Sequence, residues 1–294
     1  MSSPECTVVI PTRDCADYIP AALESVRAQG CANLEVIVIN DGSTDDTCEV
    51  VRRFAADWPE LRSIDTVNVG PAHARNAALA EARAPLIAFH RANPDVSFSF
   101  TDYLHVDPQG RSMGTCFDYW RPQYLGDRGR DHSYFCFDEP EAAILTANVV
   151  GTSTVVASLR DLQIANGFGN LSSAEDWRTW LRLAKSGRVA VSRAVTMRYL
   201  VRPNSVSRRR MDRIRAIEAI IAEYGARDEA SMRAALRSTR AIALNAKADH
   251  WRAESSHFSA LMCRLHAMLI YPDRKNVRTA VGDIRSWLRN GTEA

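Results

Sequence analysis

The sequence lacks the features that mark membrane-spanning, nucleic-acid-binding and disulfide-rich proteins. No apolar run approaches the length of about 20 residues that a transmembrane helix needs. The formal net charge is only +2, so the composition does not indicate a nucleic-acid partner. The seven cysteines are scattered, without CxxC or paired Cys/His spacing, which argues against both a zinc site and a disulfide framework.

The first residues also lack the pattern of a secretory signal, since the stretch from Met1 to Cys6 leads straight into a short apolar run. We therefore expect reduced thiols and a cytoplasmic protein. Hydrophobic residues make up 46% of the chain, which is enough for a sizeable core.

The strongest local pattern is the stretch Glu35–Thr47. Its first five residues are mostly β-branched and apolar, as in a strand buried in the middle of a parallel sheet. Gly42 then permits a tight turn, and ligands bind beyond the carboxyl ends of such strands, so Asp41 lies where a ligand is expected. In the alternative interpretation, Asp41 and Ser43 only shape the turn and cap the next helix.

Strand-like and helix-like segments alternate along the first third of the chain, which predicts right-handed crossovers and a parallel sheet. A turn at Gly70 then opens a helix that carries Arg75 and Asn76. A helix N-terminus beside an arginine suits a phosphate, whereas the alternative is a local salt bridge of Arg75. The expected strands are 7–11, 35–39, 61–67 and 85–89, and the expected helices are 17–29 and 47–57.

These stretches, taken in order, resemble a family 2 glycosyltransferase of the GT-A fold. The resemblance continues through Gly167-Phe168 and through Glu175-Asp176 with the helical run that follows, and it ends near residue 205. It implies an α/β protein with a mixed, mostly parallel sheet flanked by helices, Rossmann-like, with a C-terminal helical appendage. The implied parts are a nucleotide-sugar-binding half (1–105), an acceptor-binding half (106–207) and a C-terminal helical region (208–294).

The resemblance also implies a division of labour between two groups of residues. The donor's base and ribose would lie against Pro11, Thr12, Asp14, Asp41, Ser43 and Arg75. Asp176 would be the general base, with Glu175 and Trp177 on the acceptor side. In the alternative interpretation, the acidic pair only charges or caps the start of its helix, and the tryptophans belong to the core.

The implied reaction is an inverting transfer of a sugar from a nucleotide-diphosphate donor, a UDP-sugar by preference. The acceptor would be a glycan or a lipid-linked acceptor in cell-surface polysaccharide synthesis, with no nucleic acid involved. A sugar hydroxyl is a poor nucleophile, so a carboxylate that takes its proton fits this chemistry. The leaving diphosphate gains charge and needs a divalent ion or basic groups.

The chain departs from the family after the expected fourth strand. An Asp-x-Asp cluster that holds Mg²⁺ or Mn²⁺ is expected there, but Phe89 is followed directly by His90. Either about 15–25 residues, a loop and a short helix, are absent from the printed sequence, or the deletion is real. We assign no metal ligand, because Asn93-Pro94-Asp95 is typical of a turn. The rival function is a nucleotide-sugar-binding homologue that has lost catalysis.

The rest of the chain is less specific. Residues 115–140 are rich in aromatic side chains, which suits either an acceptor-binding lid or an irregular packed insertion. Residues 189–201 contain two strand-like runs, and Arg202, Ser205 and Ser207 are weak candidates for contact with the diphosphate. The basic triplet Arg208–Arg210 is typical of a solvated helix start. About four amphipathic helices follow from Met211, suited to docking within the protein, to a homodimer or to peripheral membrane contact.

Overall fold

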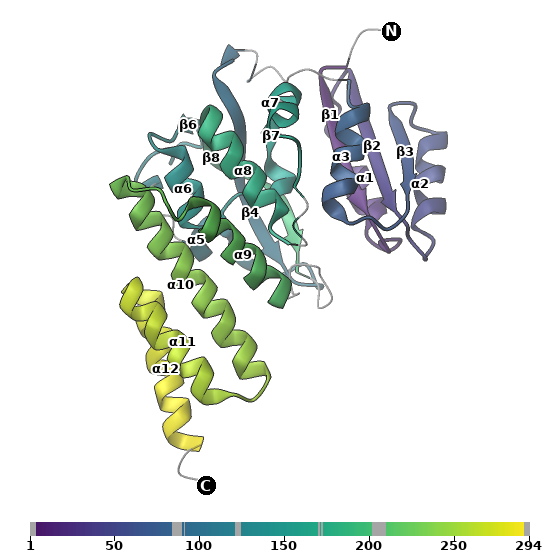
Figure 1. Cartoon of the computed structure of the whole chain (residues 1–294). Helices are drawn as coiled ribbons and strands as arrows, with labels where there is room; N and C mark the ends of the chain where they lie inside the picture. The colour runs from purple at the N-terminus through teal and green to yellow at the C-terminus, as the bar shows by residue number, and fades with distance from the viewer. Residues whose placement is uncertain are drawn as a thin grey trace. The chain divides into compact units, whose positions relative to one another are not determined.

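The structure is a computed structural model that describes residues 4–83, 90, 92–120, 125–169, 171, 173–201 and 210–290 (Figure 1). The expected strand Pro85–Phe89 and the residues Tyr124, Arg202, Ser205 and Ser207 lie outside the described residues. The chain divides into two compact units, each described here by itself. The first comprises 1–99, 155–171 and 182–189, and the second comprises 100–154, 172–181 and 190–294.

The first unit contains a parallel sheet with the strand order β1-β2-β3. Its strands are β1 (Cys6–Thr12), β2 (Leu34–Asp41) and β3 (Leu61–Thr66). Ile10 pairs with Val38, and Ile39 pairs with Ile64, so all three strands end at the same edge. The helices are α1 (Ile19–Arg27), α2 (Thr47–Ala56) and α3 (Pro71–Glu81). These elements confirm the predicted alternation of strands and helices.

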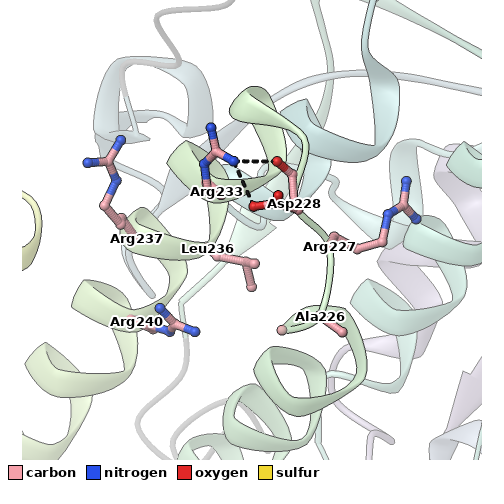
Figure 2. A pocket seen from close by; sticks show the side chains of 8 residues that line it. Ala226, Arg227, Asp228, Arg233, Leu236, Arg237 and Arg240 are labelled. Carbon is pink, nitrogen blue, oxygen red and sulfur yellow. Dashed lines mark hydrogen bonds and ion pairs between the residues drawn. The ribbon is translucent and has the colours of Figure 1, made fainter.

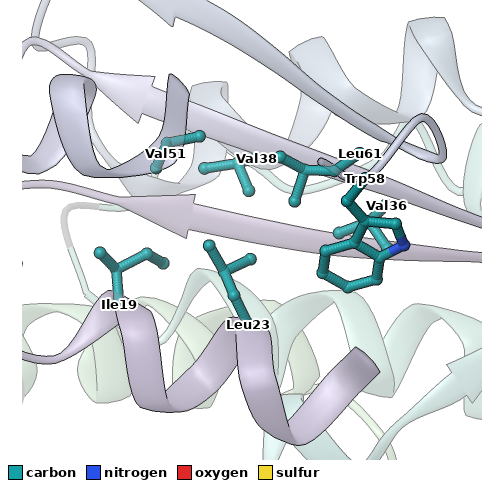
Figure 3. Close-up of a cluster of buried hydrophobic side chains, with 7 residues drawn as sticks. All are labelled: Ile19, Leu23, Val36, Val38, Val51, Trp58 and Leu61. Carbon is teal, nitrogen blue, oxygen red and sulfur yellow. The ribbon is translucent and has the colours of Figure 1, made fainter. Parts of the chain in front are cut away.

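Strand β2 is buried on both faces, which explains its unbroken apolar sequence. Figure 3 shows Ile19 and Leu23 of α1 packed against one face of the sheet, beside Val36 and Val38. On the other face, the intervening residues Ile37 and Ile39 pack against the alanines of α3. Small side chains on α3 therefore let this helix lie close to the sheet.

A second sheet has the strand order β5-β4-β8-β6, and β7 pairs with β4. The strands are β4 (Val96–Val106), β5 (Ser112–Thr115), β6 (Phe135–Cys136), β7 (Val156–Ala157) and β8 (Arg188–Leu200). β4 and β5 form an antiparallel hairpin around Asp107–Gly110, whose Asp-Pro-Gln-Gly sequence is typical of a turn. Strand β8 corrects the expectation of two runs at 189–201. Ser192 does not interrupt the strand, because its buried hydroxyl donates to the carbonyl of His132 at 2.6 Å.

Residues 115–140 carry part of the core of the second unit. They include α5 (Cys116–Trp120), where Phe117 meets Phe100 of β4 edge to face at a centroid distance of 6.2 Å. Phe137 is also buried, whereas Tyr119 and Tyr134 are exposed. Packing therefore accounts for several of the aromatic residues in this stretch. Further helices among the described residues are α6 (Pro140–Thr146), α7 (Leu159–Ile164) and α8 (Glu175–Ser186).

Four helices complete the second unit, as the sequence predicts: α9 (Arg210–Tyr224), α10 (Ala230–Ala253), α11 (His257–Ile270) and α12 (Arg274–Asn290). The hydroxyls of Ser238 and Thr239 on α10 donate to the carbonyls of Thr146 and Leu145 at 2.8 and 2.6 Å. These bonds satisfy carbonyls that the end of α6 leaves without helical partners. Among the described helices, none has the length and apolarity that crossing a membrane requires.

Candidate functional site

The carboxyl ends of β1 and β2 lead into two loops that are tied to each other by side chains. The Asp14 carboxylate accepts a hydrogen bond from the Thr44 backbone N–H at 2.7 Å, and the Asp14 N–H donates to the Ser43 hydroxyl at 3.0 Å. Asp45 accepts from the Ala16 N–H at 3.0 Å. The predicted donor residues Asp14 and Ser43 are therefore brought together, and both help to fix the shape of this edge.

Asp41 lies at the end of β2 and is only 5% exposed. Its carboxylate accepts three hydrogen bonds, from the hydroxyl of Thr66 at the end of β3 at 3.0 Å, and from the Val69 N–H at 2.7 Å and the Gly70 N–H at 2.8 Å in the chain that follows. Buried carboxylates require such partners, because an unpaired buried charge is costly. Asp41 thus shapes the connection between β3 and α3, a structural role that the sequence did not predict.

Gly42 allows the turns after β2 and β3 to approach each other. Its φ angle is +67°, and a Cβ atom there would lie 2.8 Å from the backbone nitrogen of Asn68. Any other residue would force these two backbones apart. Arg13, which follows β1, hydrogen-bonds the Asn68 side chain. The ends of all three parallel strands are therefore joined in one cluster.

Thr12 provides a free hydrogen-bonding group within this cluster. The residue is 5% exposed, and its hydroxyl has no hydrogen-bond partner in the described part of the chain. Pro11, the other predicted donor residue of β1, is half-buried. Buried polar atoms are nearly always paired, so an unpaired one at the ligand-binding edge of a parallel sheet indicates a place for a ligand atom.

Arg75 and Asn76 lie on α3 and contact the segment around Phe168, within the same unit. The Arg75 guanidinium lies over the Phe168 ring, 5.1 Å from its centroid. The Asn76 side chain donates to the Phe168 carbonyl and accepts from the Phe168 N–H, both at 2.8 Å. Gly167 must be glycine here, because its φ is +60° and a Cβ would lie 2.4 Å from Asn76 Oδ1.

Asp176, the predicted general base, lies in the first turn of α8 and is half-buried. Its Oδ2 atom accepts a hydrogen bond of 2.6 Å from the Thr152 hydroxyl, and its Oδ1 atom accepts from the Trp177 N–H at 2.7 Å. Both oxygens are therefore oriented by neighbours within the second unit. A carboxylate held in this way retains lone pairs that can accept a further proton.

The turn that carries Thr152 is itself anchored to β4. The Thr154 hydroxyl donates to carbonyls of Thr101 at 3.1 Å and Gly151 at 2.8 Å. A Cβ atom on Gly151 would lie 2.6 Å from the Tyr103 ring, so this ring packs directly on the turn. Tyr103 also contacts His105 and Tyr199, with ring centroids 5.0 and 6.0 Å away. A half-buried aromatic cluster therefore adjoins the turn that orients Asp176.

The two other predicted acceptor residues are buried. Trp177 is 2% exposed, and its Nε1–H donates to the Ile144 carbonyl at 2.8 Å. Its ring therefore belongs to the core of the second unit and is not available to stack on a sugar, which corrects its place on the acceptor side. Glu175 is 7% exposed.

The described residues do not provide a set of metal ligands. No group of three or more His, Cys, Asp or Glu side chains comes together in the part of the chain that the structure describes. Asp95 pairs with Arg188 at 2.7 Å, and this guanidinium lowers the pKa of Asp95. His90 is fully buried, with ring nitrogens 3.1 Å from the Val96 carbonyl and 3.2 Å from the Ser99 hydroxyl. His90 and Asp95, which follow the point where the Asp-x-Asp cluster is expected, thus make contacts that serve the fold.

Sequence reasoning missed two side chains that position the candidate residues. Thr66 donates to Asp41, and Thr152 donates to Asp176. A polar residue at the end of β3, beside the ends of β1 and β2, is a signal for the first of these. No local signal identifies Thr152, because its partner is 24 residues away in the sequence. Asp41 and Asp176 belong to different units, and we predict that both face one cleft that holds donor and acceptor.

Comparison with known protein families gives a match over residues 7–92, to the family described as Glycosyl transferase family 2. An uncharacterized glycosyltransferase of Escherichia coli, YibD, is 34% identical over 95 residues, which cover 32% of this chain and 28% of YibD. A teichoic acid poly(glycerol phosphate) polymerase of Staphylococcus epidermidis is 35% identical over 101 residues, which cover 33% of this chain and 14% of the polymerase. The aligned segments therefore span less than a third of these relatives.

Solved structures show the same fold over nearly the whole chain. A Pyrobaculum calidifontis mannosyltransferase, in complex with GDP-Man and Mn²⁺, matches with a TM-score of 0.60 at 19% identity, covering 97% of this chain and 85% of that one. Residues 1–349 of Staphylococcus aureus TarS, in complex with UDP, match with a TM-score of 0.59 at 19% identity, covering 96% and 91%. The architecture is thus that of a GT-A glycosyltransferase.

Proposed function

We propose that this chain, which belongs to glycosyl transferase family 2 through residues 7–92, transfers a sugar from a nucleotide-diphosphate donor to a glycan or lipid-linked acceptor. The observation that carries the proposal is the Thr12 hydroxyl, which is buried at the edge where the three parallel strands end and has no hydrogen-bond partner among the residues described. A ligand that reaches this edge gains a hydrogen bond that the protein leaves unmade. UDP is the first donor nucleotide to test, since TarS binds it.

On the donor side, the loops that follow the three parallel strands supply a preformed surface for the nucleoside. Thr12 offers its hydroxyl, and Asp14 and Ser43 hold the two adjoining loops in place. Asp41 acts mainly by fixing residues 66–70 beneath the nucleoside. Preorganised loops lower the entropic cost of binding, so these contacts favour tight donor binding.

On the acceptor side, Asp176 takes the proton from the attacking sugar hydroxyl. The oxygen of that hydroxyl forms a bond to the anomeric carbon as the bond to the donor's diphosphate breaks on the opposite side, which inverts the configuration. Thr152 keeps the carboxylate turned toward the acceptor. Of the aromatic side chains, Tyr103, His105 and Tyr199 offer half-buried ring faces for an acceptor sugar.

Within the ranges that the structure describes, no set of side chains fits the Mg²⁺ or Mn²⁺ site that the family resemblance implies. This observation favours a second candidate function, a nucleotide-sugar-binding protein without transfer activity. Both functions predict nucleotide binding at the same edge of the β1-β2-β3 sheet. They differ only in turnover.

A donor panel separates the two candidates. The full chain is incubated with UDP-, GDP- and dTDP-sugars plus a mixture of glycan acceptors, and nucleotide release and nucleotide affinity are both measured. Release from one donor that disappears in Asp176→Asn supports the transferase. Nucleotide binding without release from any donor supports the binding protein. A chain that binds none of these nucleotides contradicts both.

A further inference from the structure

A second potential ligand site lies in the helical part of the second unit. A cavity of about 470 Å³ opens where the chain passes from α9 into α10 (Figure 2). Four arginines line it, against one acidic residue, Asp228. The arginines are Arg227, Arg233, Arg237 and Arg240. We call this cavity the arginine pocket.

Two of the four arginines are already neutralised by carboxylates. Arg233 pairs with Asp228 at 2.7 Å, which Figure 2 shows as a dashed line. Arg227 pairs with Glu229 at 3.0 Å and with Glu141 at 3.1 Å. Asp228, Glu229 and Glu141 are therefore engaged by Arg233 and Arg227, and none of them pairs with the remaining two arginines.

Arg237 and Arg240 remain exposed and make no hydrogen bond or ion pair with the described residues. Positions three apart on a helix place their Cβ atoms about 5–6 Å from each other, so both guanidiniums can reach one ligand. Two neighbouring cations without a counter-ion repel each other unless an anion lies between them. The pocket therefore carries an excess of positive charge that no described carboxylate balances.

The helix that carries these arginines is held in place from its other side. Ser238 and Thr239, which follow Arg237, are buried and donate to the end of α6. Leu236 is 3% exposed and forms an apolar part of the pocket wall. The two free guanidiniums thus start from a fixed backbone, which reduces the entropy lost on binding a ligand.

We propose that the arginine pocket binds a phosphate-bearing ligand, a diphosphate or a phosphodiester segment. Arginine binds phosphate oxygens with two parallel hydrogen bonds, and a diphosphate offers enough charge and oxygens for both guanidiniums at once. A carboxylate, with one charge and two oxygens, satisfies only one of them. The identification of this ligand as the phosphate-bearing part of an acceptor rests on the proposed function. The binding of a phosphate-bearing anion to the arginine pocket does not.

Calorimetric titration of the full chain with inorganic pyrophosphate tests this proposal. The double variant Arg237→Gln/Arg240→Gln should lose one binding site, or bind there at least about tenfold more weakly, since each hydrogen bond to a charged group is worth about one tenfold step or more. The control Arg160→Gln/Arg278→Gln removes the same charge from exposed positions outside the pocket and should bind like the wild type. Thermal melts verify that both variants fold.

Identical pyrophosphate isotherms in all three proteins would overturn the site. Citrate binding that is equally tight and equally sensitive to the double variant would overturn the preference for phosphate. Neither measurement involves sugar transfer, so a failure here differs from a failure of the proposed function. That function is judged by nucleotide release from the donor panel.

Discussion

The carboxylate of Asp41 accepts a hydrogen bond of 2.8 Å from the backbone N–H of Gly70, the residue that opens α3. A side chain at the end of one strand thereby determines the conformation of the chain that leaves the next strand. This contact gives Asp41 a structural role, and its contact with the nucleotide stays a prediction.

Replacing Asp41 with Ala should reduce both stability and nucleotide affinity. Three hydrogen bonds to a buried carboxylate are lost, and the N–H groups of Val69 and Gly70 are left unpaired, which should cost about 2–3 kcal/mol of unfolding free energy. UDP affinity should fall about tenfold as the loop shifts. Asp46→Ala, at an exposed position without a side-chain cap, is the control. UDP affinity that stays at the wild-type value in Asp41→Ala would contradict a role for this loop in donor binding.

Asp176→Asn should lower kcat by about 10²–10⁴-fold, the usual range for loss of a general base, with little change in donor affinity. Thr152→Val should lower kcat less, because the carboxylate remains but loses its 2.6 Å hydrogen bond. Thr152→Ser restores the hydroxyl and should recover activity. The measurements are single-turnover rates and UDP titrations. Equal losses of donor affinity and turnover in Asp176→Asn would count against its assignment as the base.

Glu35 should make the stability of the first unit vary with pH in the acid range. Burial by itself would raise its pKa, but hydrogen bonds from the Arg83 N–H, the Thr7 hydroxyl and the Arg83 guanidinium lower it from 4.5 to about 2. The charged form is therefore favoured in the folded state. Its stabilisation is complete above about pH 4.5 and is lost as the pH falls toward 2.

Glu35→Gln should thus destabilise the protein by about 2 kcal/mol at pH 7, and the difference from the wild type should shrink between pH 4.5 and pH 2. Urea unfolding at a series of pH values provides the measurement. Glu49→Gln is the matched control, since Glu49 is exposed and its pair with Arg53 should contribute less than about 0.5 kcal/mol. If the difference in unfolding free energy between Glu35→Gln and the wild type were constant with pH, the charge of Glu35 would not contribute to stability.

Arg264→Ala should destabilise the C-terminal helices. Arg264 is 8% exposed and connects α10 to α12 through Asn245, Asp249 and Asp283. Removing one partner from a buried ionic network leaves uncompensated charge and should cost about 3 kcal/mol. Thermal unfolding followed by circular dichroism measures the loss. Arg215→Ala, at an exposed position, should shift the midpoint little, and equal shifts in both variants would contradict the importance of this network.

Chelation should have little effect on UDP binding. The described residues bring no three metal-ligating side chains together, and the chain runs from Phe89 directly to His90 without an Asp-x-Asp pair. We expect UDP dissociation constants measured in EDTA and in Mn²⁺ to agree within about threefold. A much tighter complex in Mn²⁺ would mean that nucleotide and protein assemble a metal site together.

The sequence by itself determined the local elements and their order. Apolar runs, glycine turns and helical periodicity depend on near neighbours, so the β1–α3 alternation, the Asp107–Gly110 hairpin and the four C-terminal helices were all predictable. The edge at which Asp41 lies followed from the same pattern, because parallel strands end together.

Tertiary structure alone decided which side chains meet. Asn76 and Phe168 are 92 residues apart, and Thr152 and Asp176 are 24 residues apart, so no periodicity connects them. Burial also decided that Trp177 belongs to the core and that β8 continues through Ser192. Periodicity places Arg237 and Arg240 on one helix, but only the fold leaves both without a carboxylate partner in the described chain. Long-range contacts depend on how elements pack, which neighbouring residues do not encode.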